Sequence, residues 1–484
     1  MTQEVKRAKT IPIVEVGTTE QALYEVRRKI HPRSVQGLYA NLRWFFVWFT
    51  QIIFYGLPWL QWNDRQAVLF DLGARKFYLF GLVLWPQDII YLALLLIASA
   101  LALFLFTAVA GRLFCGYACP QTVYTEIFMW IEKVVEGDRF ARLRLDASPW
   151  NARKIRLRFT KHVLWVAVAL WTGFTFIGYF SPIRPLIGEA LSGSLGFWQI
   201  FWWGFYSFAT WGNAGFMREQ VCKYMCPYAR FQSVMVDNDT YVVTYDPVRG
   251  EPRGSRSRKE DHRAAGKGDC VDCSICVQVC PTGIDIRQGL QVECIGCGLC
   301  VDACDQVMDK MNYPRGLISY STERTIQNRT SKSEARRRVL RPRVLIYSVL
   351  LLAVTGVLFG SLFTRDALRF DVIRDRTVLA REIEGGNIEN VYRLQLMNTT
   401  ESEMLVKVSA EGLTSLKVRS SNNSDADHIE VMVSAASNSM LPLRVEHPVD
   451  GLEPGSHPIH FVIESSWPGG RETVREASSF IVPR

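Results

Sequence analysis

The chain has 484 residues, a formal net charge of +9, 12 cysteines, 14 tryptophans and 27 phenylalanines. Its mean hydropathy is near neutral because strongly apolar and strongly polar stretches balance, which favours a membrane protein with substantial soluble parts over a single soluble domain. The lysines and arginines lie mostly beside apolar stretches, so we expect a lipid membrane, and no nucleic acid, as a partner. Every cysteine falls in a motif, which argues against a disulfide framework and indicates metal or redox ligands in a reducing compartment.

The N-terminal segment, residues 1–37, lacks the apolar core of a cleavable signal peptide and is expected to be cytoplasmic. After it, five windows are apolar over the roughly 20 residues that a membrane-spanning helix needs. They are residues 38–60, 88–110, 160–180, 196–217 and 343–363. A shorter apolar run, 77–85, ends at Pro86 and is too short to cross, so it is expected to be an interfacial or re-entrant piece.

Basic residues near the ends of these windows predict the orientation of the chain. They are dense before the first window, after the second and before the fifth, whereas the loop after the third, residues 181–195, has only Arg184. Five crossings would therefore leave the N-terminus and the segment between the fourth and fifth windows in the cytoplasm. The residues beyond 363 would lie on the outer side.

Two C-x3-C-P motifs follow the second and fourth windows within the predicted transmembrane domain, residues 38–247. They contain Cys115 and Cys119, and Cys222 and Cys226. Cysteines at i and i+4 share a helix face, although the following proline disfavours helical backbone at the second cysteine and indicates an unwound site. One pair suits Cu(I), whereas two pairs together supply four thiolates for zinc or an iron–sulfur centre. Packing cysteines and an oxidisable thiol pair are the alternatives.

The segment 248–325 begins with a linker rich in Gly, Pro, Arg and Lys and continues with eight cysteines. Their spacing, C-x2-C-x2-C-x3-C-P and then C-x2-C-x2-C-x3-C, is that of a cytoplasmic two-cluster ferredoxin, in which the fourth cysteine of each run binds the other cluster. A zinc ribbon needs only four sulfurs. The predicted ligand sets for two 4Fe-4S clusters are Cys270, Cys273, Cys276 and Cys304 for one, and Cys294, Cys297, Cys300 and Cys280 for the other.

A basic linker and the last window occupy residues 326–369, and a tail follows over 370–484. Runs such as 391–397 and 428–433 alternate apolar and polar residues between Asn, Ser, Gly and Pro turns, which predicts an immunoglobulin-like β-sandwich. His447, His457 and His460 in this tail are more simply interpreted as unligated. The predicted fold is therefore a multi-domain membrane protein: an α-helical bundle of about five spans, an inserted two-cluster ferredoxin domain and a C-terminal β-sandwich.

The segments Phe114–Thr122 and Cys222–Arg230, the paired ferredoxin motif and the β-rich tail together resemble the CcoG/FixG/RdxA family of cytochrome oxidase accessory proteins. The resemblance covers nearly the whole chain. It implies a bacterial inner-membrane protein with a periplasmic C-terminal domain that helps to assemble the cbb3-type oxidase. It further implies a cupric reductase, in which copper is bound transiently and reduced from Cu(II) to Cu(I). The implied catalytic residues and copper ligands are Cys115, Cys119, Cys222 and Cys226.

The chemistry of these residues agrees with that implication, because thiolates favour Cu(I) whereas Cu(II) prefers nitrogen and oxygen. The expected path runs from a cytoplasmic electron donor through two clusters to copper, and onward to the oxidase or its copper-delivery factors. Oxidation of the thiols to a disulfide, followed by their regeneration, is a second route. Two other classes stay open: a quinol-linked relay like the membrane ferredoxins similar to NapH and NosR, and a redox sensor or scaffold without turnover.

Overall fold

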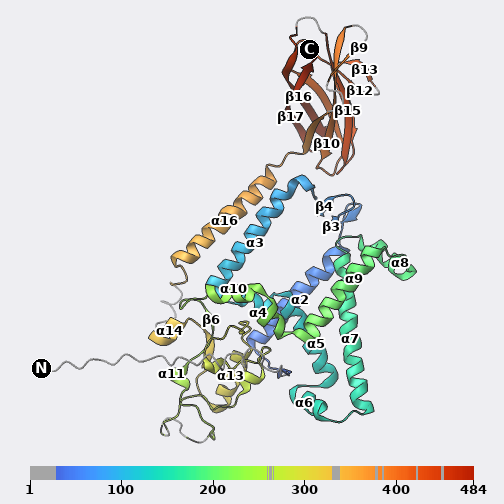
Figure 1. The fold of residues 1–484 in the computed structure, drawn as a ribbon. Coiled ribbons are helices and arrows are strands. Elements are labelled where there is room, and N and C mark those ends of the chain that lie inside the picture. The colour runs from blue at the N-terminus through green and yellow to red at the C-terminus, as the bar shows by residue number, and fades with distance from the viewer. Residues whose placement is uncertain are drawn as a thin grey trace, which may run out of the picture.

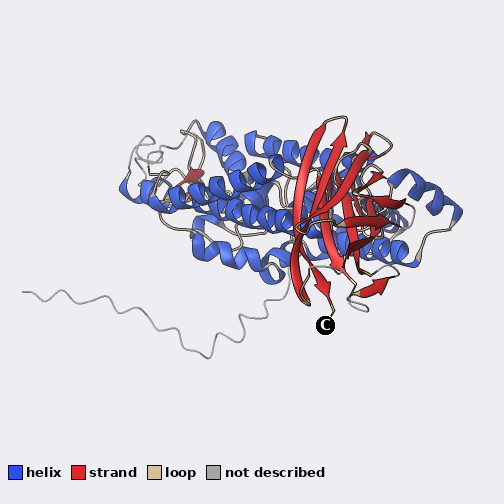
Figure 2. Cartoon of the chain, turned by 90° about the horizontal axis from the view of Figure 1, so that it is seen from above, coloured by secondary structure: helices blue, strands red, loops and turns tan. Residues whose placement is uncertain are grey.

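The computed structural model describes residues 29–258, 260, 264, 266–329, 338–375, 380–383, 386–420, 423–448 and 452–483. Most of the predicted N-terminal segment and residues 330–337 of the basic linker therefore lie outside the described residues. The molecule is elongated, with a β-sandwich at one end, long helices in the middle and a cysteine-rich domain at the other end (Figure 1). Seen from above, the helices spread into a long layer and the sandwich stands over only part of it (Figure 2).

Three helices in the described part of the chain are long and apolar enough to cross a membrane. They comprise α3 (Ile89–Ala110), α7 (Ala152–Ile177) and α16 (Pro342–Phe363). The first and third of these pack side by side, with the rings of Phe104 and Tyr347 6.3 Å apart, and both lead toward the sandwich (Figure 1). These helices support assignment of the chain to the membrane proteins.

The other two of the five predicted windows form α2 (Leu38–Gly56) and α9 (Phe197–Thr210), which do not meet the length and hydropathy of the three candidate spans. Five crossings therefore stay a prediction. Helix α2 has 19 residues but carries Arg43, which is buried and paired with Glu126 on another helix. Helix α9 has only 14 residues, about 21 Å at 1.5 Å per residue, before it widens into the π-helical segment η4 (Trp211–Met217). It packs along α7, where Trp203 Nε1 donates to the Leu170 carbonyl at 2.9 Å.

The apolar run 77–85 forms strands, so the re-entrant alternative is wrong and the interfacial one stays a prediction. The run forms β4 (Lys76–Leu79) and β5 (Leu82–Leu84), which extend an antiparallel meander that starts with β3 (Val68–Asp71). Phe70 N donates to the Tyr179 carbonyl at 2.7 Å, which fixes the meander to the end of α7. The small hairpin of β1 (Gln61–Trp62) and β2 (Arg65–Gln66) lies beside it.

The C-terminal part is a two-sheet sandwich, which confirms the predicted immunoglobulin-like fold. One sheet has the order β13-β12-β15-β10-β8 with β9 paired to β10, and the other has the order β14-β11-β16-β17. Alternating residues such as Tyr392, Leu394 and Phe461 are fully buried between the sheets. The strands are β8 (Leu368–Arg374), β9 (Arg381–Ile383), β10 (Asn387–Asn398), β11 (Met404–Glu411), β12 (Lys417–Ser420), β13 (Asn423–Ala426), β14 (His428–Val433), β15 (Asn438–Pro448), β16 (Gly455–Trp467) and β17 (Gly470–Val482).

Buried charge joins the sandwich to the helical part. Asp88, just before α3, is almost fully buried and pairs with Arg365 at 2.6 Å and with Arg369. A second contact joins Glu401 to Asn63, whose Nδ2 donates to the carboxylate at 2.7 Å. Asp88, which lies where the helical part meets the sandwich, therefore has a structural role.

The cysteine-rich domain is an insertion closed by two strands. The chain enters through β6 (Val242–Tyr245) and leaves through the antiparallel β7 (Ile318–Ser321). Its small core includes Val243, Met308 and Leu317. The remaining helices, grouped by position, are α4 (Leu113–Tyr117), α5 (Pro120–Glu136), α6 (Arg139–Ala147), α8 (Ile183–Ser192), η5 (Val221–Met225), α10 (Pro227–Met235), α11 (Pro247–Gly250), α12 (Ile275–Gln278), α13 (Leu299–Met311) and α14 (Glu323–Asn328), with short 3-10 turns at Leu57–Trp59, Pro86–Asp88 and Ile286–Gln288.

Candidate metal centres

The eight cysteines of the insertion line two small neighbouring cavities. Cys276 lies on the wall of both. The first cavity is lined by Cys270, Cys273, Cys276 and Cys304, and the second by Cys276, Cys280, Cys294, Cys297 and Cys300. Within these walls, the cysteines group as the crossed ferredoxin pattern predicts.

Short loops and one helix place these thiols. Asp272, Ser274, Gly296 and Gly298 have positive φ angles, which bend the chain sharply between successive cysteines of each C-x2-C-x2-C run. Helix α13 carries Cys300 in its first turn and Cys304 one turn later, so one helix contributes a thiol to each cavity. The two cavities are therefore held at a fixed separation.

The donor set of both cavities fits 4Fe-4S clusters. Burial raises the pKa of Cys294 and of Cys304 to about 12, so these thiolates need a bound cation at neutral pH. In the described residues no three His, Cys, Asp or Glu side chains gather closely enough to hold a single metal ion. A 4Fe-4S cluster does not require several side chains to meet at one ion, because each thiolate binds a different iron atom.

The two C-x3-C-P motifs lie together although they are far apart in the sequence. Gln121 Nε2, beside the first motif, donates to the carbonyl of Arg218, just before the second motif, at 3.1 Å. The charges of Cys119, Cys222 and Cys226 also act on the thiol of Cys115. In each motif a short helix, α4 or η5, ends one or two residues before the second cysteine, whose backbone is extended, and the following proline starts a new helix. The pairs therefore sit at helix breaks, as the prolines predict. We call this group the four-thiol site.

Burial controls the ionisation of the four-thiol site. It raises the pKa of Cys115 to about 12 and that of Cys222 to about 11, and the neighbouring thiolates raise both further. Burial also raises the pKa of Cys119, but the backbone N–H groups of Thr122 and Gln121 at the start of α5 oppose this. Cys115 Sγ donates to Gln232 Oε1 at 3.3 Å. A soft cation would replace these protons and bind to sulfur alone.

The four-thiol site touches the second cysteine cavity directly. Cys115 packs against Ile295 and Cys297 in one apolar cluster. Gly116 allows this approach, because an added Cβ would lie 2.9 Å from the Ile295 carbonyl oxygen and 3.2 Å from Cys297 Cα. Tyr117 Oη donates to the Cys297 carbonyl at 3.1 Å. Helix α4 therefore rests on the loop that carries Cys294 and Cys297, and the two centres share a wall.

Sequence reasoning missed two arginines beside these centres. Arg112, three residues before Cys115, lowers the pKa of thiols in both centres, Cys115 and Cys294, although burial outweighs it. Arg43 of α2 is buried and its charge interacts with Cys297 and Cys280. The signal for Arg43 was a lone arginine inside an apolar window.

The histidines of the tail do not form a site in the described residues. His447 lies on β15 of one sheet, and its Nδ1 contacts the Pro448 carbonyl at 2.5 Å. His457 and His460 lie on β16 of the other sheet.

Three family models match the chain. Residues 217–323 match a 4Fe-4S dicluster domain, and residues 92–136 match a 4Fe-4S binding domain. Residues 358–483 match the IG-like fold at the C-terminus of FixG, whose description names it as a candidate oxidoreductase. The match over residues 92–136 contains Cys115 and Cys119, which lie outside the ferredoxin motif.

Relatives match over most of their length. The nitrogen fixation protein FixG of Rhizobium meliloti is 38% identical over 458 residues, which cover 87% of each chain. Protein RdxA of Cereibacter sphaeroides is 38% identical over 446 residues, covering 90% of this chain and 92% of RdxA. Among solved structures, a FixG-related protein from Vibrio parahaemolyticus is 23% identical and covers 24% of this chain and 97% of its own, with a TM-score of 0.20.

Proposed function

The chain belongs to the family of the iron–sulfur proteins FixG and RdxA, and we propose that it is a membrane-bound cupric reductase. In this proposal it reduces Cu(II) to Cu(I) at the four-thiol site. The Cu(I) then serves assembly of a cbb3-type cytochrome oxidase, received by the oxidase itself or by its copper-delivery factors. Copper is the substrate and the two 4Fe-4S clusters are the resident cofactors.

The contact between Cys115 and Cys297 carries this proposal. Cys270, Cys273, Cys276 and Cys304 would hold one cluster, and Cys280, Cys294, Cys297 and Cys300 the other; when bound, they supply one-electron transfer. Cys115 is buried and the other three thiols of the site are partly buried. A pair of these thiols would bind copper through sulfur alone, which favours Cu(I) over Cu(II). The ion gains one electron while its ligands lose their protons to solvent.

The positions of the two ends of the molecule support the orientation in a bacterial inner membrane that the sequence predicts. The cysteine-rich domain and the sandwich lie at opposite ends of the described chain (Figure 1), and one candidate span, α16, connects them. Basic residues at the ends of the predicted spans favour a cytoplasmic cysteine-rich domain. The sandwich is then periplasmic, and oxygen-sensitive clusters lie in the reducing compartment.

The double variant Cys119→Ala with Cys226→Ala tests the proposal. We expect it to lose formation of Cu(I), followed with a Cu(I)-specific chelator after anaerobic reduction of the protein with dithionite. The absorbance of the clusters should stay intact, since neither residue lines the two cysteine cavities. Tyr224→Phe, at an exposed side chain of η5, is the matched control. Copper reduction at the wild-type rate in the double variant would refute the proposal.

The family match over residues 92–136 favours a second occupant of the four-thiol site, a third 4Fe-4S cluster. Iron analysis separates the two, because two cubanes contribute about eight iron atoms per chain and three contribute about twelve. In the double variant the iron content stays near eight if copper is the occupant. A fall from about twelve to eight identifies the site as a permanent cluster and the chain as an electron relay.

A further inference from the structure

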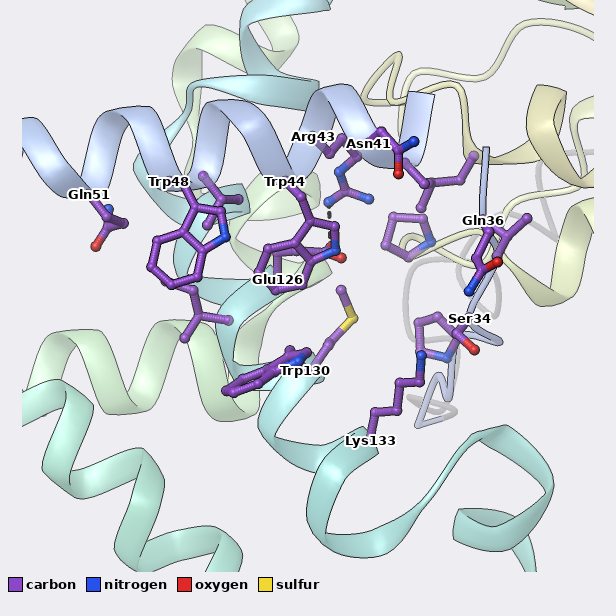
Figure 3. A pocket seen from close by; sticks show the side chains of 18 of the residues that line it. Ser34, Gln36, Asn41, Arg43, Trp44, Trp48, Gln51, Glu126, Trp130 and Lys133 are labelled. Atoms are coloured by element: carbon purple, nitrogen blue, oxygen red, sulfur yellow. Dashed lines mark ion pairs between the residues drawn. The ribbon is translucent and has the colours of Figure 1, made fainter. Parts of the chain in front are cut away.

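A large cavity that the proposed function does not use lies among α2, α5 and α7. It has a volume of about 1000 Å³ and extends from the stretch 32–36 to Trp171, toward the C-terminal end of α7. The polar end is lined by Ser34, Gln36 and Asp138, and the opposite end by Ile52 and Trp171. We call it the α2–α5 cavity (Figure 3). Its polarity suits a ligand with a polar head and a long apolar tail.

Indole rings form much of its wall. Trp44, Trp48 and Trp130 lie along the cavity between Gln51 at one end and Ser34 at the other (Figure 3). Trp48 is 63% exposed and Trp130 is 51% exposed, so the described chain leaves at least half of each side chain uncovered. The rings of Trp44 and Trp130 meet edge to face at 6.4 Å. Such a wall offers flat apolar surfaces to a planar ring.

The same cavity reaches the second cysteine cavity. Val279 and Pro281, which flank Cys280, line it together with Leu299, which precedes Cys300. Two ligands of the second cluster are therefore one residue away from its wall. A redox-active occupant at this end would exchange electrons with that centre over a short distance.

An ion pair marks the same end. Arg43 and Glu126 both line the cavity and pair at 2.8 Å between Nη2 and Oε2 (Figure 3). Arg43 is 2% exposed, and its Nη1 has no hydrogen-bond partner in the described part of the chain. Its charge is balanced by Glu126, so the position suits a neutral oxygen acceptor better than a phosphate.

We propose that the α2–α5 cavity binds an isoprenoid quinol, which donates the electrons, in place of the cytoplasmic donor expected from the sequence. The quinol ring lies between the indoles and Arg43, and its chain runs past Ile52 and Trp171 into the lipid. The transfer of these electrons to copper rests on the proposed function. One quinol breaks two O–H bonds and releases two protons through the polar end, and two Cu(II) ions each gain one electron.

Quenching of tryptophan fluorescence by decylubiquinone, measured on the full chain in nanodiscs without copper, tests the site. We expect saturable quenching in the wild type. The variant Trp48→Ala with Trp130→Ala should weaken binding about tenfold, as loss of two aromatic contacts predicts. Trp198→Ala, at a 66% exposed ring on α9 that does not line the cavity, is the matched control. Equal affinity in both variants, or displacement of decylubiquinone by phosphatidylglycerol alone, overturns the assignment.

Anaerobic addition of decylubiquinol provides a second readout. It should give the EPR signal of reduced clusters in the wild type and in Trp198→Ala, and this reduction should be lost in the double variant. The variant Trp48→Ala with Trp130→Ala should still reduce Cu(II) after reduction with dithionite. This result separates failure of the quinol site from failure of the proposed function. Bound quinol that leaves the EPR spectrum of the wild type unchanged overturns the donor role.

Discussion

The two kinds of cysteine centre differ in how the chain builds them. The eight cysteines of the insertion lie within residues 270–304, and short loops with α13 place them. The four-thiol site instead joins α4 to η5, which come from distant parts of the chain. A centre built by local loops depends on the spacing of its cysteines in the sequence. A centre built by helix packing depends on the contacts that hold its helices together.

The largest test of this comparison is Glu132→Gln. Glu132 is fully buried on α5 and pairs with Arg218 and Arg142, each at 2.8 Å. Arg218 precedes η5, so the pair ties the two halves of the four-thiol site together. Removing one partner of a buried ion network costs about 3–5 kcal/mol. We expect loss of Cu(I) binding with the iron content of the insertion retained, measured by metal analysis.

Glu476→Gln, at an exposed position of β17, is the matched control and should bind Cu(I) normally. Equal loss of iron and Cu(I) binding in Glu132→Gln would show that the two centres depend on the same packing. The comparison would then fail.

The same carboxylate gives a pH dependence. Burial alone would raise the pKa of Glu132, but the charges of Arg218, Arg142 and Lys161 outweigh it and hold the pKa below the usual 4.5. A depressed pKa contributes stability that is present above the unfolded value and is lost as the pH falls through the folded value. Acid unfolding of the wild type, followed by tryptophan fluorescence below pH 4.5, should therefore be steeper than that of Glu132→Gln. Identical slopes would contradict this assignment.

A smaller change, Gly116→Val, should weaken the contact between the two centres while both keep their metals. Gly116→Val places side-chain atoms against the carbonyl of Ile295, and such overpacking costs about 1–3 kcal/mol. We expect both centres to keep their metals while electron transfer from reduced clusters to copper slows, measured by rapid mixing. Gly356→Ala, where an added Cβ meets nothing within 4 Å, is the control. An unchanged rate would show that the contact does not carry electrons.

The smallest expected effect comes from Tyr117→Phe. It removes the hydrogen bond from Tyr117 Oη to the Cys297 carbonyl, which is worth about 0.5–1.5 kcal/mol. The apolar contact of Cys115 with Ile295 stays, so we expect only a slight loss of thermal stability and a modest fall in rate, observed by calorimetry and rapid mixing. A fall as large as that of Gly116→Val would instead assign the coupling to the hydroxyl.

The difference between the centres also explains what the sequence can predict. The spacing of Cys270 to Cys304 predicts ligand sets because a few residues of loop decide which sulfurs meet. Proline after Cys119 and Cys226 predicts the helix breaks for the same local reason. No local rule shows that Cys115 lies against Cys297, because that contact depends on packing between distant segments.

The membrane-embedded part shows the same limit. The apolar window of α2 does not show that its Arg43 finds a buried partner in Glu126 on α5. The run 77–85 was too short to cross, but its pairing in β4 and β5 depends on β3 and on the end of α7. Alternation in the tail predicts the sandwich because the period of a strand is local. The α2–α5 cavity has no sequence signal, since its walls come from separate helices and the insertion.

The most direct test of the account follows both partners of the electron transfer at once. Anaerobic protein reduced with dithionite and freed of excess reductant is mixed with Cu(II) and a Cu(I)-specific chelator, and cluster absorbance and Cu(I) are recorded together. The account predicts that the clusters reoxidise at the rate at which Cu(I) forms, with one electron lost for each Cu(I). Clusters that stay reduced while Cu(I) fails to form, or Cu(I) that forms without their reoxidation, would contradict it.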